Sequence, residues 1–117
     1  MAEVPGPMKF CIVIVPSQDG DRLLAQMAEQ GFRATRIGST GGFLKRGSAT
    51  VFSAIPAEKV PDLVALLHRE FPEVIEKMPL TALPFADELE GGPAAMVDVR
   101  VGGAVLFVLD LDRVERV

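Results

Sequence analysis

The chain has 117 residues, 49% of them hydrophobic, and a net charge of −4 from 12 basic and 16 acidic residues. This length fits one domain with its own core. One cysteine and one histidine exclude a disulfide scaffold and a Cys/His metal site, and we predict no bound metal or cofactor. No apolar run reaches the roughly 18 residues of a membrane span, and no signal peptide precedes the first apolar run. We therefore expect a cytoplasmic protein without membrane insertion.

Residues 1–7 are small and punctuated by proline and glycine, and we expect a flexible leader before a domain that spans residues 8–117. Residues 10–15, Phe-Cys-Ile-Val-Ile-Val, contain no charged side chain and predict a central strand buried on both faces. A helix follows, with its N-cap at Ser17 or Asp19 and apolar residues at helical spacing.

Residues 32–39 and 49–55 are strand-like, and the glycine-bearing segment 40–48 is expected to join them as an antiparallel pair. A second helix is predicted after Pro56. Its apolar residues recur at the spacing of one helix face and form the stripe Val60, Leu63, Val64, Leu67 and Phe71.

Residues 72–95 contain four prolines and little periodicity, which predicts a long loop. Residues 97–101 then alternate valine with charged residues, and an apolar run at 104–109 follows Gly102 and Gly103. Two strands separated by this glycine pair indicate a hairpin, with a bulge in one continuous strand as the alternative.

The order strand, helix, strand, strand, helix, strand predicts an α+β, ferredoxin-like fold with an additional C-terminal β-hairpin arm. In this fold a four-stranded antiparallel sheet carries both helices on one face. The other face is left apolar and uncovered, so we expect several subunits to pack sheet to sheet. A homotrimer would form three equivalent clefts.

Residues 30–57 contain no carboxylate but four basic residues, a local charge of +4 in an acidic chain: Arg33, Arg36, Lys45 and Arg46. This contrast predicts a small phosphorylated ligand rather than nucleic acid, because the rest of the surface repels polyanions. The alternative is that the four residues are the solvated faces of two strands.

The segment Thr40-Gly41-Gly42-Phe43-Leu44 lies inside this basic stretch. Glycine amides can approach a phosphate closely, and an aromatic ring offers a stacking surface for a nucleobase. The alternative is a tight turn with its phenylalanine in the core.

No residue pattern predicts catalysis. His68 has no serine or cysteine nucleophile near it in sequence and is expected on the surface of the second helix. The acidic residues Asp87, Glu88 and Glu90 are expected to be solvated. A small phosphohydrolase with Arg33 as an anion clamp is an alternative function, but it lacks a general base beside the basic residues.

Residues 31–36, 39–47 and 99–108 contain the phrases G-F-R-A-T, T-G-G-F-L and V-G-G-A-V-L-F-V. At these spacings the chain resembles the PII-like cyclic-di-AMP receptor family, from about Met8 to Val117. The resemblance implies a non-catalytic signalling receptor, a homotrimer with one cyclic dinucleotide in each inter-subunit cleft. It also implies that the long loop responds to the ligand and contacts an unidentified downstream protein.

The resemblance assigns ligand-binding roles to residues in four parts of the chain. Arg33, Ala34 and Thr35 would contact the phosphate and base, and Gly42, Phe43 and Leu44 would surround one adenine. Gly47 would allow the loop to close, and Phe107 would form an apolar wall.

Three further ligand-binding positions depart from the family pattern. Ser48 stands where an asparagine is expected, and its hydroxyl does not provide the paired donor and acceptor of an amide. Ala54 replaces a glycine and can crowd a base, and Arg116 replaces a glutamine and cannot accept a hydrogen bond. Another adenine nucleotide is therefore the alternative ligand.

Overall fold

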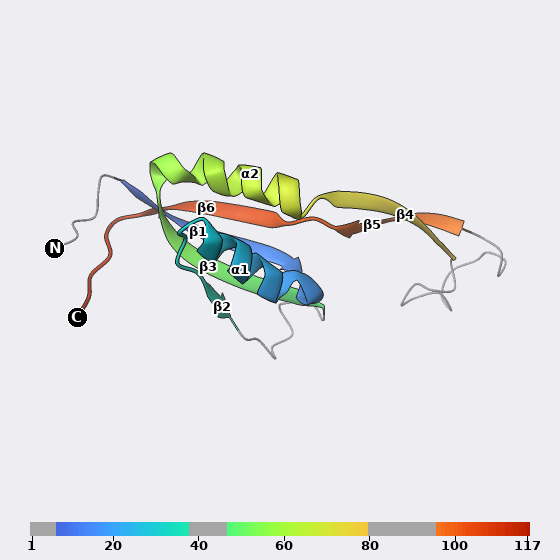
Figure 1. The fold of residues 1–117 in the computed structure, drawn as a ribbon, viewed down its shortest axis with the longest axis horizontal. Coiled ribbons are helices and arrows are strands. Elements are labelled where there is room, and N and C mark those ends of the chain that lie inside the picture. The colour runs from blue at the N-terminus through green and yellow to red at the C-terminus, as the bar shows by residue number, and fades with distance from the viewer. Residues whose placement is uncertain (1–6, 38–46, 80–95) are drawn as a thin grey trace.

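The computed structural model describes residues 7–37, 47–79 and 96–117. Figure 1 shows two helices packed on a four-stranded sheet, with a separate two-stranded sheet extending from one end. The helices are α1 (Gly20–Glu29) and α2 (Val60–Glu70), each preceded by a short 3₁₀ turn. The four strands of the larger sheet are β1 (Met8–Pro16), β2 (Thr35–Ile37), β3 (Ser48–Pro56) and β6 (Val105–Leu111).

The larger sheet has the strand order β2-β3-β1-β6, and all neighbouring strands are antiparallel. This is the order that two interleaved strand–helix–strand units produce. β1 is therefore central, and β2 and β6 form the two edges. The predicted antiparallel pairing of the second and third strands is present, although β2 has only three residues in the described part of the chain.

Local residues favour the end of α1 and the start of α2 at the observed positions. Helix α1 stops just before Gly31, whose φ of 85° is a conformation that side chains rarely adopt. In α2, Pro61 lies in the first turn, where its missing N–H costs nothing. The Arg22 guanidinium lies 4.1 Å from the centre of the Phe71 ring and joins the two helices. No helix in the described ranges is long and apolar enough to cross a membrane.

One apolar core fills the space between the helices and the sheet. Alternate residues of the two central strands point into it, because successive side chains of a strand face opposite sides. Burial raises the pKa of the Cys11 thiol. The buried apolar residues are Cys11, Val13, Val15, Leu23, Met27, Ala49, Val51, Ile55, Leu63, Leu66, Leu67 and Phe71.

No helix of the described residues covers the opposite face of the sheet. Across the strands, Ile12 pairs with both Phe52 and Phe107, and Phe10 pairs with Leu109. Phe107 is 49% exposed and Leu109 47% exposed. The prediction that β1 is buried on both faces is therefore wrong, because its second face is only half-buried within one subunit. The predicted bare apolar face is present, and we refer to it as the open face.

The two-stranded sheet corrects two predictions. β4 (Glu73–Pro79) occupies the start of the predicted loop at 72–95 and pairs antiparallel with β5 (Met96–Gly102). The arm formed by β4 and β5 thus precedes the last strand of the main sheet instead of following it. Residues 1–6, 38–46 and 80–95 lie outside the described residues.

Gly102 and Gly103 do not form a hairpin between β5 and β6, because these strands belong to different sheets. They connect the arm to the main sheet, with φ values of 74° and 81°. The Gly103 N–H donates to the Pro72 carbonyl oxygen at 3.2 Å, so the two chain segments at the base of the arm are joined. We refer to this region, Pro72–Glu73 and Gly102–Gly103, as the arm root.

We predict that Gly102→Ala destabilises the protein more than Gly31→Ala. Both positions have positive φ, but a Cβ at Gly102 would lie 2.9 Å from the Pro72 oxygen, whereas nothing lies within 4 Å of one at Gly31. Strain from positive φ costs about 1–3 kcal/mol, and only Gly102→Ala adds a steric clash. Urea unfolding of the two variants at one protein concentration measures their free energies of unfolding. Equal decreases in the two variants would contradict this account of the arm root.

Candidate functional site

Two of the predicted ligand residues lie in one row across the open face. Thr35 pairs with Phe52, Phe52 with Ile12, and Ile12 with Phe107. Neighbouring strands are about 4.8 Å apart, so roughly 14 Å separates the backbones of Thr35 and Phe107. They therefore lie on opposite edge strands of the sheet.

Ala54 lies on the same face, one row away. It pairs with Phe10, which in turn pairs with Leu109 on β6. Its side chain is exposed, so the methyl group that replaces the expected hydrogen atom is accessible at this surface.

Arg33 and Ala34 lie between α1 and β2, just before the strand begins. The Ser53 hydroxyl, which is buried, donates a hydrogen bond to the Arg33 carbonyl oxygen. The Phe32 N–H donates to the Met27 carbonyl at 2.9 Å and fixes the other end of this short segment. The Arg33 side chain is exposed and has no carboxylate partner among the described residues.

Arg36 corrects the charge count made from the sequence. Its Nη1 lies 2.9 Å from Asp21 Oδ1, and its guanidinium packs against Gly20 so closely that a Cβ there would lie 2.8 Å from Arg36 Cζ. Arg36 is therefore paired with a carboxylate of α1 on the helix-covered side of the sheet. Lys45 and Arg46, the other two basic residues, lie outside the described residues.

Gly47 and Ser48 lie where the chain enters β3. Gly47 has a φ of 93°, and its carbonyl oxygen accepts a hydrogen bond from the Ser17 N–H at 2.6 Å. They line a pocket of about 260 Å³ that also contains the arm root, and we refer to it as the root pocket. Its lining residues are Ile14, Val15, Pro16, Gly47, Ser48, Glu73, Gly102, Gly103, Ala104 and Val105.

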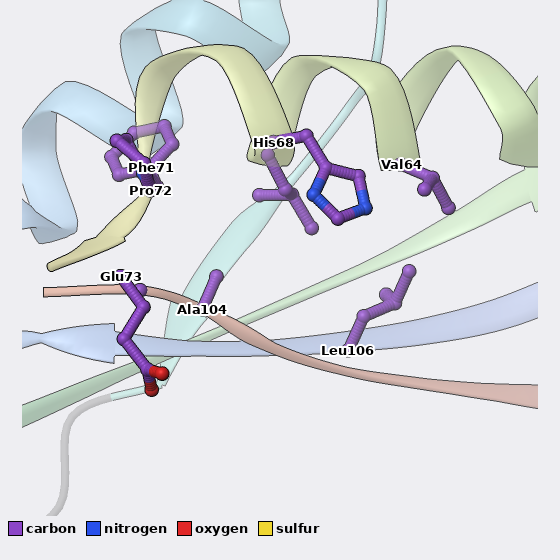
Figure 2. Close-up of a pocket in the computed structure, with 9 residues that line it drawn as sticks. Val64, His68, Phe71, Pro72, Glu73, Ala104 and Leu106 are labelled. Atoms are coloured by element: carbon purple, nitrogen blue, oxygen red, sulfur yellow. The ribbon is translucent and has the colours of Figure 1, made fainter. Parts of the chain in front are cut away.

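A second pocket, of about 290 Å³, lies on the helix-covered side, between α2 and the start of β6. Figure 2 shows His68 extending from α2 toward the sheet, near Ala104 and Leu106. His68 is exposed, as predicted, but it also lines this pocket. None of the predicted ligand residues within the described ranges lines it, so the described part of the chain does not combine His68 with Arg33 into the arrangement that a phosphohydrolase requires.

Within a single chain, the predicted ligand residues that the structure describes do not gather into a single site. Gly47 and Ser48 share the root pocket, whereas Thr35, Ala54 and Phe107 lie on the open face. Arg116 is exposed in the segment after β6, and Gly42, Phe43 and Leu44 lie outside the described residues. Sequence reasoning missed the arm-root residues of the root pocket, because Glu73 fell inside a predicted loop without periodicity.

Comparison with known proteins identifies the class to which this fold belongs. The family model described as cyclic-di-AMP receptor matches residues 8–117, and the chain belongs to this family. A functionally unknown protein from Pediococcus pentosaceus is 31% identical, with a TM-score of 0.66, and the match covers 95% of this chain and 98% of that one.

A second solved structure shows the fold in a protein of known class. It is CPII, a nitrogen regulatory PII-like protein from Thiomonas intermedia, bound to ADP, AMP and bicarbonate. The identity is 16% and the TM-score 0.55, with coverage of 96% of this chain and 98% of that one. The fold is therefore PII-like, and the chain is a PII-like member of the cyclic-di-AMP receptor family.

We predict that Ser53→Ala lowers the free energy of unfolding by about 0.5–1.5 kcal/mol, the net contribution of a typical hydrogen bond, because the part-buried bond to the Arg33 carbonyl oxygen is lost. Ser53→Thr keeps the hydroxyl and serves as the matched variant. Chemical denaturation measures stability, and hydrogen exchange at Thr35 reports on the tethered segment. Unchanged stability and unchanged hydrogen exchange in Ser53→Ala would show that the hydrogen bond to the Arg33 carbonyl oxygen does not fix the segment before β2.

Proposed function

We propose that this protein binds cyclic di-AMP in the clefts between the subunits of a homotrimer and does not transform it. The observation that carries the proposal is the division of the predicted ligand residues between opposite edges of one sheet. Thr35 lies on β2 and Phe107 on β6, roughly 14 Å apart by strand spacing. A ligand that contacts both groups fits best between two copies of the chain.

A cyclic arrangement of subunits unites these edges. If the β2 edge of one subunit meets the β6 edge of the next, the contact is head-to-tail, and a rotation of one third of a turn at each contact closes three subunits into a ring. The same arrangement turns the open face toward the other subunits and buries its exposed apolar residues, including Phe107 and Leu109. Burial of apolar area stabilises the assembly by about 25 cal/mol per Å².

The chemistry of the residues favours binding over hydrolysis. Arg33 offers a charged donor for a phosphate, the Thr35 hydroxyl can add a hydrogen bond, and Phe107 offers an apolar wall. None of the described residues assigned by the resemblance carries a carboxylate or an imidazole to act as a general base. We therefore propose a receptor without catalytic activity.

The arm is the proposed route to a downstream protein. It projects from the body of the subunit (Figure 1), and its root lines the same pocket as Gly47 and Ser48. A ligand in the root pocket would touch both the loop end and the arm. One face of the arm is also largely apolar, with Val74 paired with Val101 and Met78 with Val97, as expected of a surface that contacts another protein.

A different adenine nucleotide is the second candidate, supported by Ser48 and Ala54. Ala54 exposes its methyl group on the open face, where the family pattern has no side chain. Calorimetry with cyclic di-AMP, cyclic di-GMP, ATP and AMP separates the candidates, with one cyclic di-AMP expected per subunit. Absence of heat at about 100 μM, roughly −5.5 kcal/mol of binding free energy, would remove the cyclic di-AMP assignment.

We predict that Arg33→Gln weakens cyclic di-AMP binding at least about tenfold, because a charge-assisted hydrogen bond is lost. Arg36→Gln removes the same charge and serves as the control, since Arg36 is already paired with Asp21. Its affinity should stay within about twofold of the wild type. Equal losses in both variants would indicate general electrostatic attraction instead of a specific contact at Arg33.

A further inference from the structure

The root pocket contains an isolated pair of polar side chains. Its lining consists of three glycines, a proline and aliphatic residues, apart from Ser48 and Glu73. Among the lining residues that the structure describes, these two alone have side chains that can form hydrogen bonds. Ligand pockets commonly have this composition, with a few polar groups on an apolar wall that fix the orientation of the ligand.

Glu73 is held in place by the arm root. It is the first residue of β4 and pairs with Gly102, and a Cβ at Gly103 would lie only 3.2 Å from Glu73 Cβ. Figure 2 shows that its carboxyl group extends away from α2 and from His68, although the residue lines both pockets. The position of the carboxylate therefore favours the root pocket.

The carboxylate remains able to accept hydrogen bonds from a ligand. Its one partner among the described residues is Arg100, whose Nη1 lies 3.8 Å from Glu73 Oε1. The Glu73 side chain is 54% exposed, so this pair is solvated and weak.

The chemistry of the pair selects a ligand group. A carboxylate only accepts hydrogen bonds, so it requires a donor such as an exocyclic amine, whereas a hydroxyl can donate to a ring nitrogen. Adenine presents an amine beside a ring nitrogen. At about 260 Å³ the pocket lies below the range of about 300–1,000 Å³ for whole drug-sized ligands, which suits one base of a dinucleotide.

We propose that Glu73 is a specificity-determining residue that accepts a hydrogen bond from the exocyclic amine of an adenine base, while the Ser48 hydroxyl bonds to a ring nitrogen. This inference rests on the proposed function and names a contact within it. The amide expected at position 48 would supply a donor and an acceptor from one side chain. Here the donor comes from β3 and the acceptor from β4, so a bound base also joins the arm to the main sheet.

The test compares cyclic di-AMP with cyclic di-IMP, in which a carbonyl oxygen replaces each exocyclic amine. Glu73→Met removes the acceptor at similar length and should weaken cyclic di-AMP binding by about tenfold to a hundredfold, as expected for a hydrogen bond to a charged group. The wild type should prefer cyclic di-AMP by a similar factor. Glu73→Gln supplies an amide donor for the carbonyl oxygen and should reduce this preference to within about threefold.

Two variants control for indirect effects. Glu76→Gln changes the same charge on β4, away from the root pocket, and should bind both nucleotides as the wild type does. Arg100→Gln breaks the surface ion pair but keeps the carboxylate, so it should preserve the preference for cyclic di-AMP. Thermal unfolding and light scattering check the fold and assembly of each variant.

The outcomes separate this inference from the proposed function. Absence of binding of either nucleotide to the wild type would overturn both. Wild-type binding of cyclic di-AMP with an unchanged preference in Glu73→Gln would overturn the role of Glu73 alone. Should Glu73→Met fail to fold, the nucleotide preference of Glu73→Gln still decides the question, because a purely structural role of Glu73 would leave the preference for cyclic di-AMP over cyclic di-IMP unchanged.

Discussion

The alternation of side chains along β1 and β3 determines most of what this protein can do. One set of alternate residues, such as Val13 and Val51, packs under both helices and forms the core. The other set, such as Ile12 and Phe52, remains on a face that no helix covers. A sheet with an apolar open face gains stability from burying that face against other subunits. The proposed assembly and the location of the proposed clefts therefore both rest on the same two-residue period.

The arm root links this sheet to the part of the molecule that extends from it. Two consecutive glycines with positive φ allow the chain to leave β5 and enter β6 in another sheet, and a hydrogen bond to Pro72 closes the junction. The same junction brings Glu73 beside Ser48 in one pocket. A ligand in this pocket would therefore contact the base of the arm directly, so no other side chains would be needed to transmit its binding to the arm.

The charges show why sequence counts and structural sites differ. Arg33 and Arg36 are three residues apart and contribute equally to the count in the carboxylate-free stretch. In the structure Arg36 pairs with Asp21, 15 residues earlier in the chain, whereas Arg33 has no carboxylate partner among the described residues. Attraction for a phosphate depends on which charges lie close together in space. On the helix-covered side of β2, Asp21 of α1 neutralises Arg36, but it does not reach Arg33.

Local patterns in the sequence determined the two helices, the antiparallel core strands, the bare apolar face and the family, because these depend on periodicity, turn residues and motif spacing. The resemblance to a known family assigned Thr35, Ala54 and Phe107 to the ligand, but it did not show that Thr35 and Phe107 lie on opposite edge strands with Ala54 on β3 between them. Only the tertiary structure decided that residues 73–79 form a strand, since 16 residues separate it from its partner β5, Pro72 precedes it and Pro79 is its last residue. Only the tertiary structure placed Glu73 with Ser48, because that proximity arises from pairing between distant segments, which no local pattern records.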